Sequence, residues 1–360
     1  MPLFSLLNSK CFWRSSIAFA FSLTILQIAN SSSLQTPPSP IQCNQNPYKQ
    51  LNLILNPSGT VTRPNKPPES PPAPDPPLSI PVLSKDLIIN QSKGIWVRIY
   101  LPREALDHRS KLPLIVFFHG GGFIFLSAAS TIFHNFCFNM ANDVTAVIAS
   151  VEYRLAPEHR LPVAYEDAVE ALHWIRTNQE DDWLRNHVDY SNVFLMGSSA
   201  GGNIAYNAGV RVAEDNYDQI RGLLLVQPFF GGTNRTGSEL RLANNTHLNL
   251  CVNDALWELS LPIGVDRDHE YCNPTVGIGP ERFEFIIRHG WWVLVTGCGG
   301  DPLVDRQVQL VRMMQKEGVR VVGHFTPGDY HGVQDDDPLK AKELYGVIKT
   351  FISALHAQYY

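Results

Sequence analysis

The chain is 360 residues long, has 29 basic and 34 acidic residues, and carries a formal net charge of −5. This length exceeds that of a typical domain, but α/β folds often continue past about 250 residues around one sheet, so we expect one large domain with insertions. No run of Lys or Arg with interleaved aromatic residues is present to attract a phosphate backbone, which excludes nucleic acid as the expected partner.

The first forty residues have the order of a secretory signal. Lys10 and Arg14 precede a mostly apolar stretch, residues 16–29, and the small polar residues 30–33 follow it. A spanning helix needs about 20 apolar residues, so we do not expect a membrane anchor. An unstructured leader outside the fold would have the same composition, and that alternative stays open.

Six cysteines are scattered without paired spacings, so the sequence predicts neither a disulfide framework nor a CxxC metal site. They stand at positions 11, 43, 137, 251, 272 and 298. Sequons occur at Asn30, Asn90, Asn234 and Asn244, and they matter only if the chain is secreted.

The remainder of the chain predicts a doubly wound α/β sheet with an antiparallel entry. Prolines crowd residues 64–81, which we expect to cross the surface in an extended form. An antiparallel pair, 86–89 and 95–101, follows around the turn residues 90–94. Continuous apolar runs then indicate parallel strands covered on both faces; they are 114–118, 144–151, 193–196, 223–226 and 293–296. Helical periods lie at 165–175 and 304–314, and a last strand, 319–325, precedes a last helix, 344–355. In such sheets function gathers where the strands end.

The strand at 193–196 runs into the sequence Gly-Ser-Ser-Ala-Gly-Gly, residues 197–202, and then into a helical pattern. In a nucleophile elbow, only very small side chains fit two positions before and two after the central serine. Gly197 and Gly201 fill these positions around Ser199. The same residues also occur in ordinary Ser/Gly-rich turns, so the interpretation depends on matching parts elsewhere.

The strand that begins at 114 ends in a glycine-rich loop, His-Gly-Gly-Gly-Phe. Consecutive glycines let backbone N–H groups approach the oxyanion that forms during acyl transfer. We predict Gly121 and Gly122 as two donors and Ala200 as the third, with His119 and Gly120 supporting the loop. A phosphate cradle is the alternative, but the GxGxxG and Walker patterns are absent.

A serine hydroxyl needs a base to take its proton, and the base needs a carboxylate to fix its tautomer. In this type of fold the acid and the histidine follow the serine along the chain. Asp301 lies in a loop at the end of the strand 293–296, whereas its rival Asp305 falls inside the helix that follows. We therefore predict Asp301 as the acid.

Three histidines follow the predicted acid. His331 lies in a turn-rich loop just past a strand, whereas His324 lies within that strand and His356 on the last helix. A lone histidine before a glycine is usually an ordinary surface residue, but the other parts of the site stand in matching positions. His331 is the predicted base.

Five motifs in this order resemble the plant carboxylesterase family, the hormone-sensitive-lipase-like branch of the α/β-hydrolases and kin of gibberellin receptors and 2-hydroxyisoflavanone dehydratases. The motifs are residues 119–123, 153–159, 197–203, 301–305 and 330–332, and the match runs from about Pro47 to the C-terminus. The resemblance implies an α/β-hydrolase fold with a mostly parallel sheet, flanking helices and a small helical cap. It further implies a serine esterase that acts on short acyl or aryl esters without metal or cofactor, with Ser199, Asp301 and His331 as its triad.

Pattern and resemblance together divide the chain. From their residue pattern, we expect residues 1–40 to be a leader or signal-like extension outside the fold. We expect 41–81 to form an N-terminal cap segment with a Pro-rich connection, and 82–360 to form the catalytic domain, with a cap insertion near 236–262. Family members usually carry an acid where Ser198 stands, and most lack such a leader. The resemblance therefore implies a cytoplasmic protein, with the secretory pathway as the alternative.

Ester sites are mostly apolar, and several apolar residues follow strand ends or lie in the expected cap. Our candidates for the pocket lining are Phe123, Phe229, Phe230, Trp257 and Leu303. Residues of these types are also common in an ordinary core. The expected partner is a small-molecule ester, with neither nucleic acid nor membrane, and the oligomeric state leaves no mark on the sequence.

Three other functions share parts of this pattern. The gibberellin receptors have lost the catalytic histidine, whereas this chain keeps His331. The dehydratases replace the nucleophile with threonine, whereas this chain has Ser199. An acyl transferase or an esterase of specialised metabolites would carry the same triad and remains open.

Overall fold

The computed structural model of the protein describes residues 43, 46–107, 111–178, 180–214, 219–276 and 280–356. The chain divides into two units, Met1–Ser32 and Ser33–Tyr360, and every described residue belongs to the second. The expected leader at 1–40 therefore lies outside the described residues. No helix in the described ranges is both long and apolar enough to cross a membrane.

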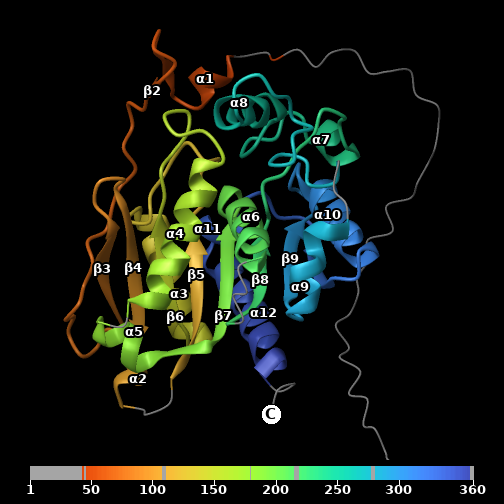
Figure 1. Ribbon diagram of the computed structural model, residues 1–360. Helices are drawn as coiled ribbons and strands as arrows, with labels where there is room; N and C mark the ends of the chain where they lie inside the picture. The colour runs from red at the N-terminus through yellow and green to blue at the C-terminus, as the bar shows by residue number, and fades with distance from the viewer. Residues whose placement is uncertain are drawn as a thin grey trace, which may run out of the picture. The chain divides into compact units, whose positions relative to one another are not determined.

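An eight-stranded sheet forms the centre of the second unit, in the order β10-β9-β8-β7-β5-β6-β4-β3 (Figure 1). Strands β5 to β10 run parallel, while β4 pairs antiparallel with both β3 and β6. The strands are β3 (Val82–Asn90), β4 (Ile95–Pro102), β5 (Leu112–Phe118), β6 (Val147–Glu152), β7 (Val188–Ser198), β8 (Ile220–Val226), β9 (Trp292–Cys298) and β10 (Arg320–Thr326). The doubly wound sheet with an antiparallel entry is confirmed.

Helices cover both faces of the sheet, because successive strand residues point to opposite sides. On β5, Ile115 packs into a core with helices α3 (Thr131–Val144) and α12 (Pro338–His356). Its neighbour Val116 packs into the opposite core with α4 (Val163–Thr177), α6 (Ala200–Glu214) and α10 (Val304–Lys316). Burial on both faces explains why these strands are continuous apolar runs.

The strand expected at 144–151 is wrong at its start. Val144 is the last residue of α3, Thr145 takes a left-handed conformation with φ 62°, and β6 begins only at Val147. A buried helix end is followed directly by a buried strand, so one apolar run spans both. The buried residues of α3 recur at helical spacing and are Phe133, Phe136, Cys137, Met140, Ala141 and Val144.

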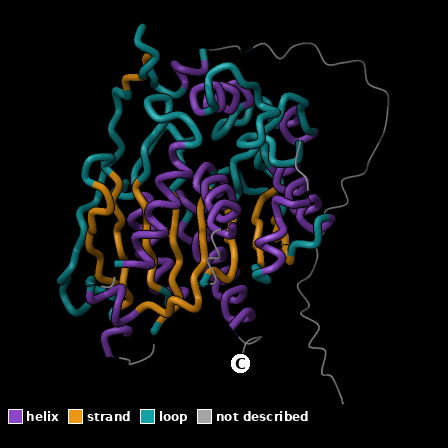
Figure 2. Tube along the Cα trace, viewed as in Figure 1, coloured by secondary structure: helices purple, strands orange, loops and turns teal. Residues whose placement is uncertain are grey.

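Some of the remaining elements lie beyond the carboxyl ends of the parallel strands, and others, such as α2 (Glu104–Asp107) and α5 (Asp182–His187), lie at the amino ends (Figure 2). Helices α7 (Gly237–Arg241) and α8 (Leu250–Ser260) lie between β8 and β9, where the sequence predicts a cap insertion. The segment 63–81 forms no helix or strand beyond one isolated bridge, as its prolines predict. The other short elements are α1 (Pro47–Gln50), β1 (Ile54–Leu55), β2 (Val61–Thr62), the 3₁₀ turn η1 (Pro280–Phe283), α9 (Glu284–Arg288) and α11 (Val333–Asp336).

The N-terminal cap segment is tied to α8 by a disulfide. Cys43 and Cys251 are bonded, with their Cα atoms 5.8 Å apart. Nearby, Tyr48 Oη donates to Glu258 Oε2 at 2.9 Å. This bond was missed from the sequence, which predicts no disulfide framework, because its cysteines are 208 positions apart and no local spacing indicates the pairing.

Candidate active site

Ser199 occupies a sharp turn between β7 and α6. Its φ is +55°, a left-handed value that a non-glycine residue adopts only under constraint. The backbone supplies that constraint, because Ser199 N–H donates to Val226 O and Ser199 O accepts from Phe229 N–H, both at 2.9 Å. The hydroxyl is thereby presented at the carboxyl end of the strand, as in a nucleophile elbow.

Glycine is required on both sides of this turn. A Cβ at Gly197 would lie 2.0 Å from Gly201 O, and a Cβ at Gly201 would lie 1.9 Å from Phe118 O. Both contacts are with backbone, which cannot swing aside. Gly197 and Gly201 are therefore required by the close backbone contacts of this turn.

The structure brings Ser199, His331 and Asp301 together from three different strand ends. His331 Nε2 lies 2.8 Å from Ser199 Oγ, and His331 Nδ1 lies 2.9 Å from Asp301 Oδ2. Because a carboxylate oxygen only accepts, Nδ1 carries the ring proton and Nε2 accepts from the serine hydroxyl. The rival Asp305 lies in α10, where its Oδ2 accepts from Ser238 N–H.

The Asp301 carboxylate is completely buried and held by further donors. Leu303 N–H donates to Oδ1 at 2.8 Å, and Gln307 Nε2 donates to Oδ2 at 2.8 Å. With His331 this makes three donors on the two oxygens. The carboxylate is therefore fixed in the orientation that reaches the imidazole.

Two carboxylates act on His331. Burial lowers the pKa of this imidazole, but the negative charges of Asp301 and Asp335 outweigh burial and raise the pKa above its ordinary value. Asp335 lies in α11, where burial raises its own pKa to about 7. Its Oδ1 is buried and has no hydrogen-bond partner among the residues described.

The raised pKa of His331 predicts where the pH–rate profile falls off on its acid side, which we call the acid limb. A base must be neutral to accept a proton, so kcat/KM should fall as the pH drops through the pKa of His331. Asp335→Asn removes one charge that raises this pKa, so the acid limb should move to lower pH while the plateau at higher pH stays close to wild type. A pH–rate profile with p-nitrophenyl acetate measures both. An unmoved limb would contradict a charge on Asp335 beside the histidine.

The glycine-rich loop after β5 lies beside the elbow. A Cβ at Gly120 would lie 3.4 Å from Ser199 Cβ. Gly121 and Gly122 have φ of +109° and +61°, and within the described ranges no group accepts a hydrogen bond from their N–H groups. Ala200 is the first residue of α6, so its N–H has no acceptor within the helix. The loop therefore lies next to the serine at Gly120, and a role of Gly121, Gly122 and Ala200 as oxyanion donors remains a prediction.

His119 supports this loop. It is fully buried, its Nδ1 bonds Gly120 O at 2.8 Å, and its ring stacks on Tyr153 with centroids 4.2 Å apart. Burial lowers the pKa of His119 to about 4, which keeps the ring neutral. Tyr153 Oη also donates to His119 O at 2.8 Å. The residue is placed to brace the loop rather than to act as a base.

The apolar candidates divide into an aromatic cluster and two other positions. Phe229 and Trp257 stack with centroids 4.8 Å apart, and Phe123 lies 5.6 Å from Trp257. Phe230 instead packs edge-on against Tyr206 in the core. Leu303 is buried beside the acid. A role in binding substrate remains a prediction for all five.

Sequence reasoning missed three buried glutamines around the triad. Gln307 bonds Asp301, Gln334 Nε2 donates to Ser198 Oγ at 2.9 Å, and Gln227 bonds the backbone beside His331. Ser198, where the family usually has an acid, is completely buried and serves as that acceptor. Gln227 could have been predicted from the sequence, because it is a polar residue directly after an apolar strand. Gln307 and Gln334 lie on helices and gave no comparable signal.

No cluster of three or more His, Cys, Asp or Glu side chains suited to a metal ion occurs in the part of the chain that the structure describes.

Comparison with known proteins identifies the family. Residues 115–335 match a family model described as alpha/beta hydrolase fold. Carboxylesterase 20 of Arabidopsis thaliana is 50% identical over 324 residues, covering 88% of this chain and 98% of that protein. The 3-O-acetylpapaveroxine carboxylesterase CXE2 of Papaver somniferum is 42% identical, covering 85% of this chain and 99% of that protein. Among solved structures, a Pyrobaculum calidifontis esterase is 27% identical with a TM-score of 0.65, covering 76% of this chain and 85% of the other. The chain therefore belongs to the α/β-hydrolase family and, within it, to the plant carboxylesterases.

Proposed function

We propose that the chain hydrolyses small carboxylic esters through an acyl-enzyme on Ser199. The observation that carries this proposal is the continuous hydrogen-bonded path from Ser199 Oγ through His331 to Asp301, at 2.8 and 2.9 Å. Free backbone amides at Gly121, Gly122 and Ala200 beside the serine complete the requirements of acyl transfer.

Each group has a defined part in the reaction. As Ser199 Oγ attacks the ester carbonyl, His331 Nε2 takes the hydroxyl proton and Asp301 stabilises the resulting imidazolium. The three amides stabilise the oxyanion, and His331 then protonates the leaving alcohol. Water repeats the sequence on the acyl-enzyme, with His331 again as the base.

Short acyl or aryl groups fit this site best. Leu256 of α8 approaches the oxyanion loop so closely that a Cβ at Gly122 would lie 2.8 Å from it. We propose that this close approach of the cap limits the site to short acyl groups, with the buried aromatic cluster of Phe123, Phe229 and Trp257 packed nearby. A relative named for an acetylated substrate, 3-O-acetylpapaveroxine, supports the same class.

Turnover and covalent labelling together test this function. We expect hydrolysis of p-nitrophenyl acetate and butyrate, and much slower hydrolysis of the palmitate ester. A diethyl phosphate ester such as paraoxon should modify one residue per chain, and peptide mass spectrometry should place the adduct on Ser199. If the protein is inert to these esters and unlabelled, yet binds a hormone-like ligand tightly, a receptor function replaces the esterase.

We further propose that the chain matures in an oxidising compartment, the secretory alternative to the cytoplasm. The Cys43–Cys251 disulfide supports this, because disulfides persist in secreted proteins and are rare in the cytosol. The charged, apolar and small-residue order of residues 10–33 supports it as well. Mass spectrometry of the protein from its source tissue should find the leader removed and the disulfide intact. An N-terminus at Met1 with both cysteines reduced would contradict the proposal.

A further inference from the structure

Gln227 bonds the backbone on both sides of His331. It directly follows β8 and is only 4% exposed. Its Nε2 donates to Tyr330 O at 3.2 Å, and its Oε1 accepts from Gly332 N–H at 2.7 Å. One side-chain amide thus engages the residue before the histidine and the residue after it.

Gln227 is itself anchored to the sheet. Its N–H donates to Thr296 O of β9 at 3.0 Å, and its φ is +42°, a left-handed value for a non-glycine residue. Its Nε2 also lies 3.1 Å from Cys298 Sγ at the end of β9. The backbone of Gln227 is therefore held at the ends of β8 and β9, and its side-chain amide contacts β9 as well as the histidine loop.

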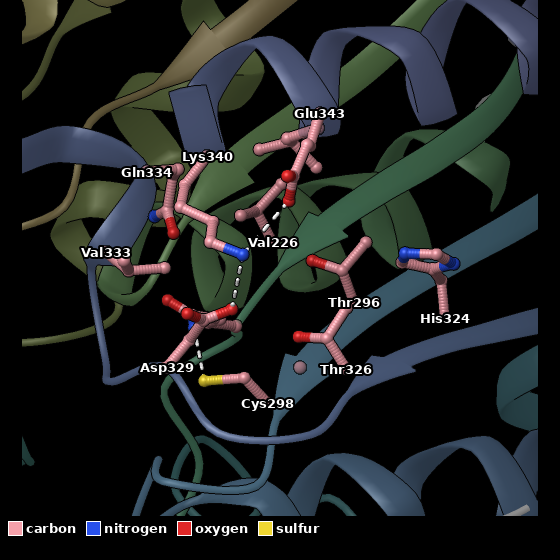
Figure 3. Close-up of a pocket in the computed structure, with 13 residues that line it drawn as sticks. Val226, Thr296, Cys298, His324, Thr326, Asp329, Val333, Gln334, Lys340 and Glu343 are labelled. Carbon is pink, nitrogen blue, oxygen red and sulfur yellow. Dashed lines mark hydrogen bonds and ion pairs between the residues drawn. The ribbon is translucent and has the colours of Figure 1, made fainter. Parts of the chain in front are cut away.

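A cavity of about 70 Å³ lies against the histidine loop (Figure 3). Asp329 and Val333 line it from the loop, and Thr296, His324 and Thr326 line it from the ends of β9 and β10. Because side chains do not fill this space, van der Waals packing does not fix the loop on this side.

One other contact acts on the main chain of the loop: Gly300 N–H donates to Gly328 O at 3.0 Å, three residues before His331. Two further contacts act on the side chains of the loop. The Tyr330 ring stacks on His247 of the cap with centroids 3.8 Å apart, and Lys340 Nζ lies 3.3 Å from Asp329 Oδ2. Lys340 is 32% exposed, and ion pairs of this kind contribute little. Neither the ring stacking nor the ion pair involves the main chain next to His331, which the Gln227 amide does bond.

We infer that Gln227 is a positioning residue for His331. Its amide holds the loop where Nε2 reaches Ser199 and Nδ1 reaches Asp301. The inference rests on the proposed function, since it takes His331 as the general base. Without the amide the loop can shift toward the cavity, and a displacement of about 1 Å in a catalytic group costs on the order of 100-fold in rate.

Gln227→Met tests this role, because methionine has a similar length but neither the donor nor the acceptor. We expect kcat for p-nitrophenyl acetate to fall roughly 10- to 100-fold with KM little changed. The acid limb of the pH–rate profile should also move to lower pH, because a displaced His331 loses the contact with Asp301 that raises its pKa. Gln227→Asn keeps an amide but is one methylene too short to reach both groups, so it carries the same expectation if the methionine variant does not fold.

Two controls separate positioning from stability. Asn273 also buries an amide that donates to Asp268 and accepts from Thr275, so Asn273→Leu should lower the melting temperature without moving the acid limb. Lys340→Met removes the exposed tie on the histidine loop and should leave kcat close to wild type.

Unchanged kcat in Gln227→Met, or a loss of kcat with an unmoved acid limb, would overturn the inference. The variant His331→Ala distinguishes this failure from failure of the proposed function. If His331→Ala is inactive while Gln227→Met is fully active, the esterase stands and the positioning role is wrong. If His331→Ala keeps its activity, the proposed function itself is wrong.

Discussion

Ser199→Ala should reduce kcat for p-nitrophenyl acetate by about a million-fold, down to the rate set by bound substrate and the oxyanion donors. The expected loss is this large because Ser199 Oγ is the atom that would form the acyl bond, and His331 Nε2 lies 2.8 Å from it. Stopped-flow measurement should also show that the burst of p-nitrophenol disappears, since no acyl-enzyme can accumulate. The paraoxon adduct should disappear from the same peptide.

The neighbouring serine provides a matched control. Ser198 is completely buried, whereas Ser199 is partly exposed, and the Ser198 hydroxyl accepts from Gln334 instead of bonding His331. Ser198→Ala removes one acceptor of that buried amide, which costs up to about 1–3 kcal/mol of stability. Its esterase activity should stay within about tenfold of wild type once the protein is folded. Equal loss in both variants would show that the elbow tolerates no change, and would remove the evidence for Ser199 as the nucleophile.

Most of the sheet and of the triad could be predicted from the sequence, because both depend on local sequence patterns. Strands buried on two faces must be apolar throughout, and parallel strands end at the same edge. Polar residues that follow such strands, as Asp301 and His331 do, are therefore expected to lie close together. This expectation needs no information on tertiary contacts. The glycines at 197 and 201 could be identified for a related reason, since only glycine fits where the Cβ would meet backbone.

The remaining features depend on contacts that no local pattern records. The Cys43–Cys251 bond joins positions 208 residues apart. The helix α3 had a clear period, but its end at Val144 merged with the apolar start of β6. Gln307 and Gln334 bond the triad and the elbow from helices, where a polar residue would ordinarily indicate a solvent-facing position.

Asp301→Asn should lower kcat on the order of 10⁴-fold while leaving KM for p-nitrophenyl acetate nearly unchanged. Both oxygens of Asp301 face donors, Leu303 N–H at Oδ1 and Gln307 Nε2 at Oδ2, where His331 Nδ1 also bonds. An asparagine must turn its NH₂ group toward one of these donors. If the NH₂ faces His331, the ring carries its proton on Nε2 and cannot accept from Ser199; if it faces Leu303, a buried N–H loses its acceptor.

A substitution at Asp305, the rival carboxylate, tests whether the loss of kcat is specific to Asp301. Asp305 lies four positions later in α10 and accepts from Ser238 N–H, with no contact to His331. Asp305→Asn should therefore keep kcat within about tenfold of wild type, whereas Asp301→Asn loses kcat even at temperatures where the variant is fully folded. A titration of the His331 ring protons by NMR would show the cause, because the variant loses the charge that raises the pKa of this histidine. If Asp305→Asn were the inactive variant, the acid of the triad would have to be reassigned.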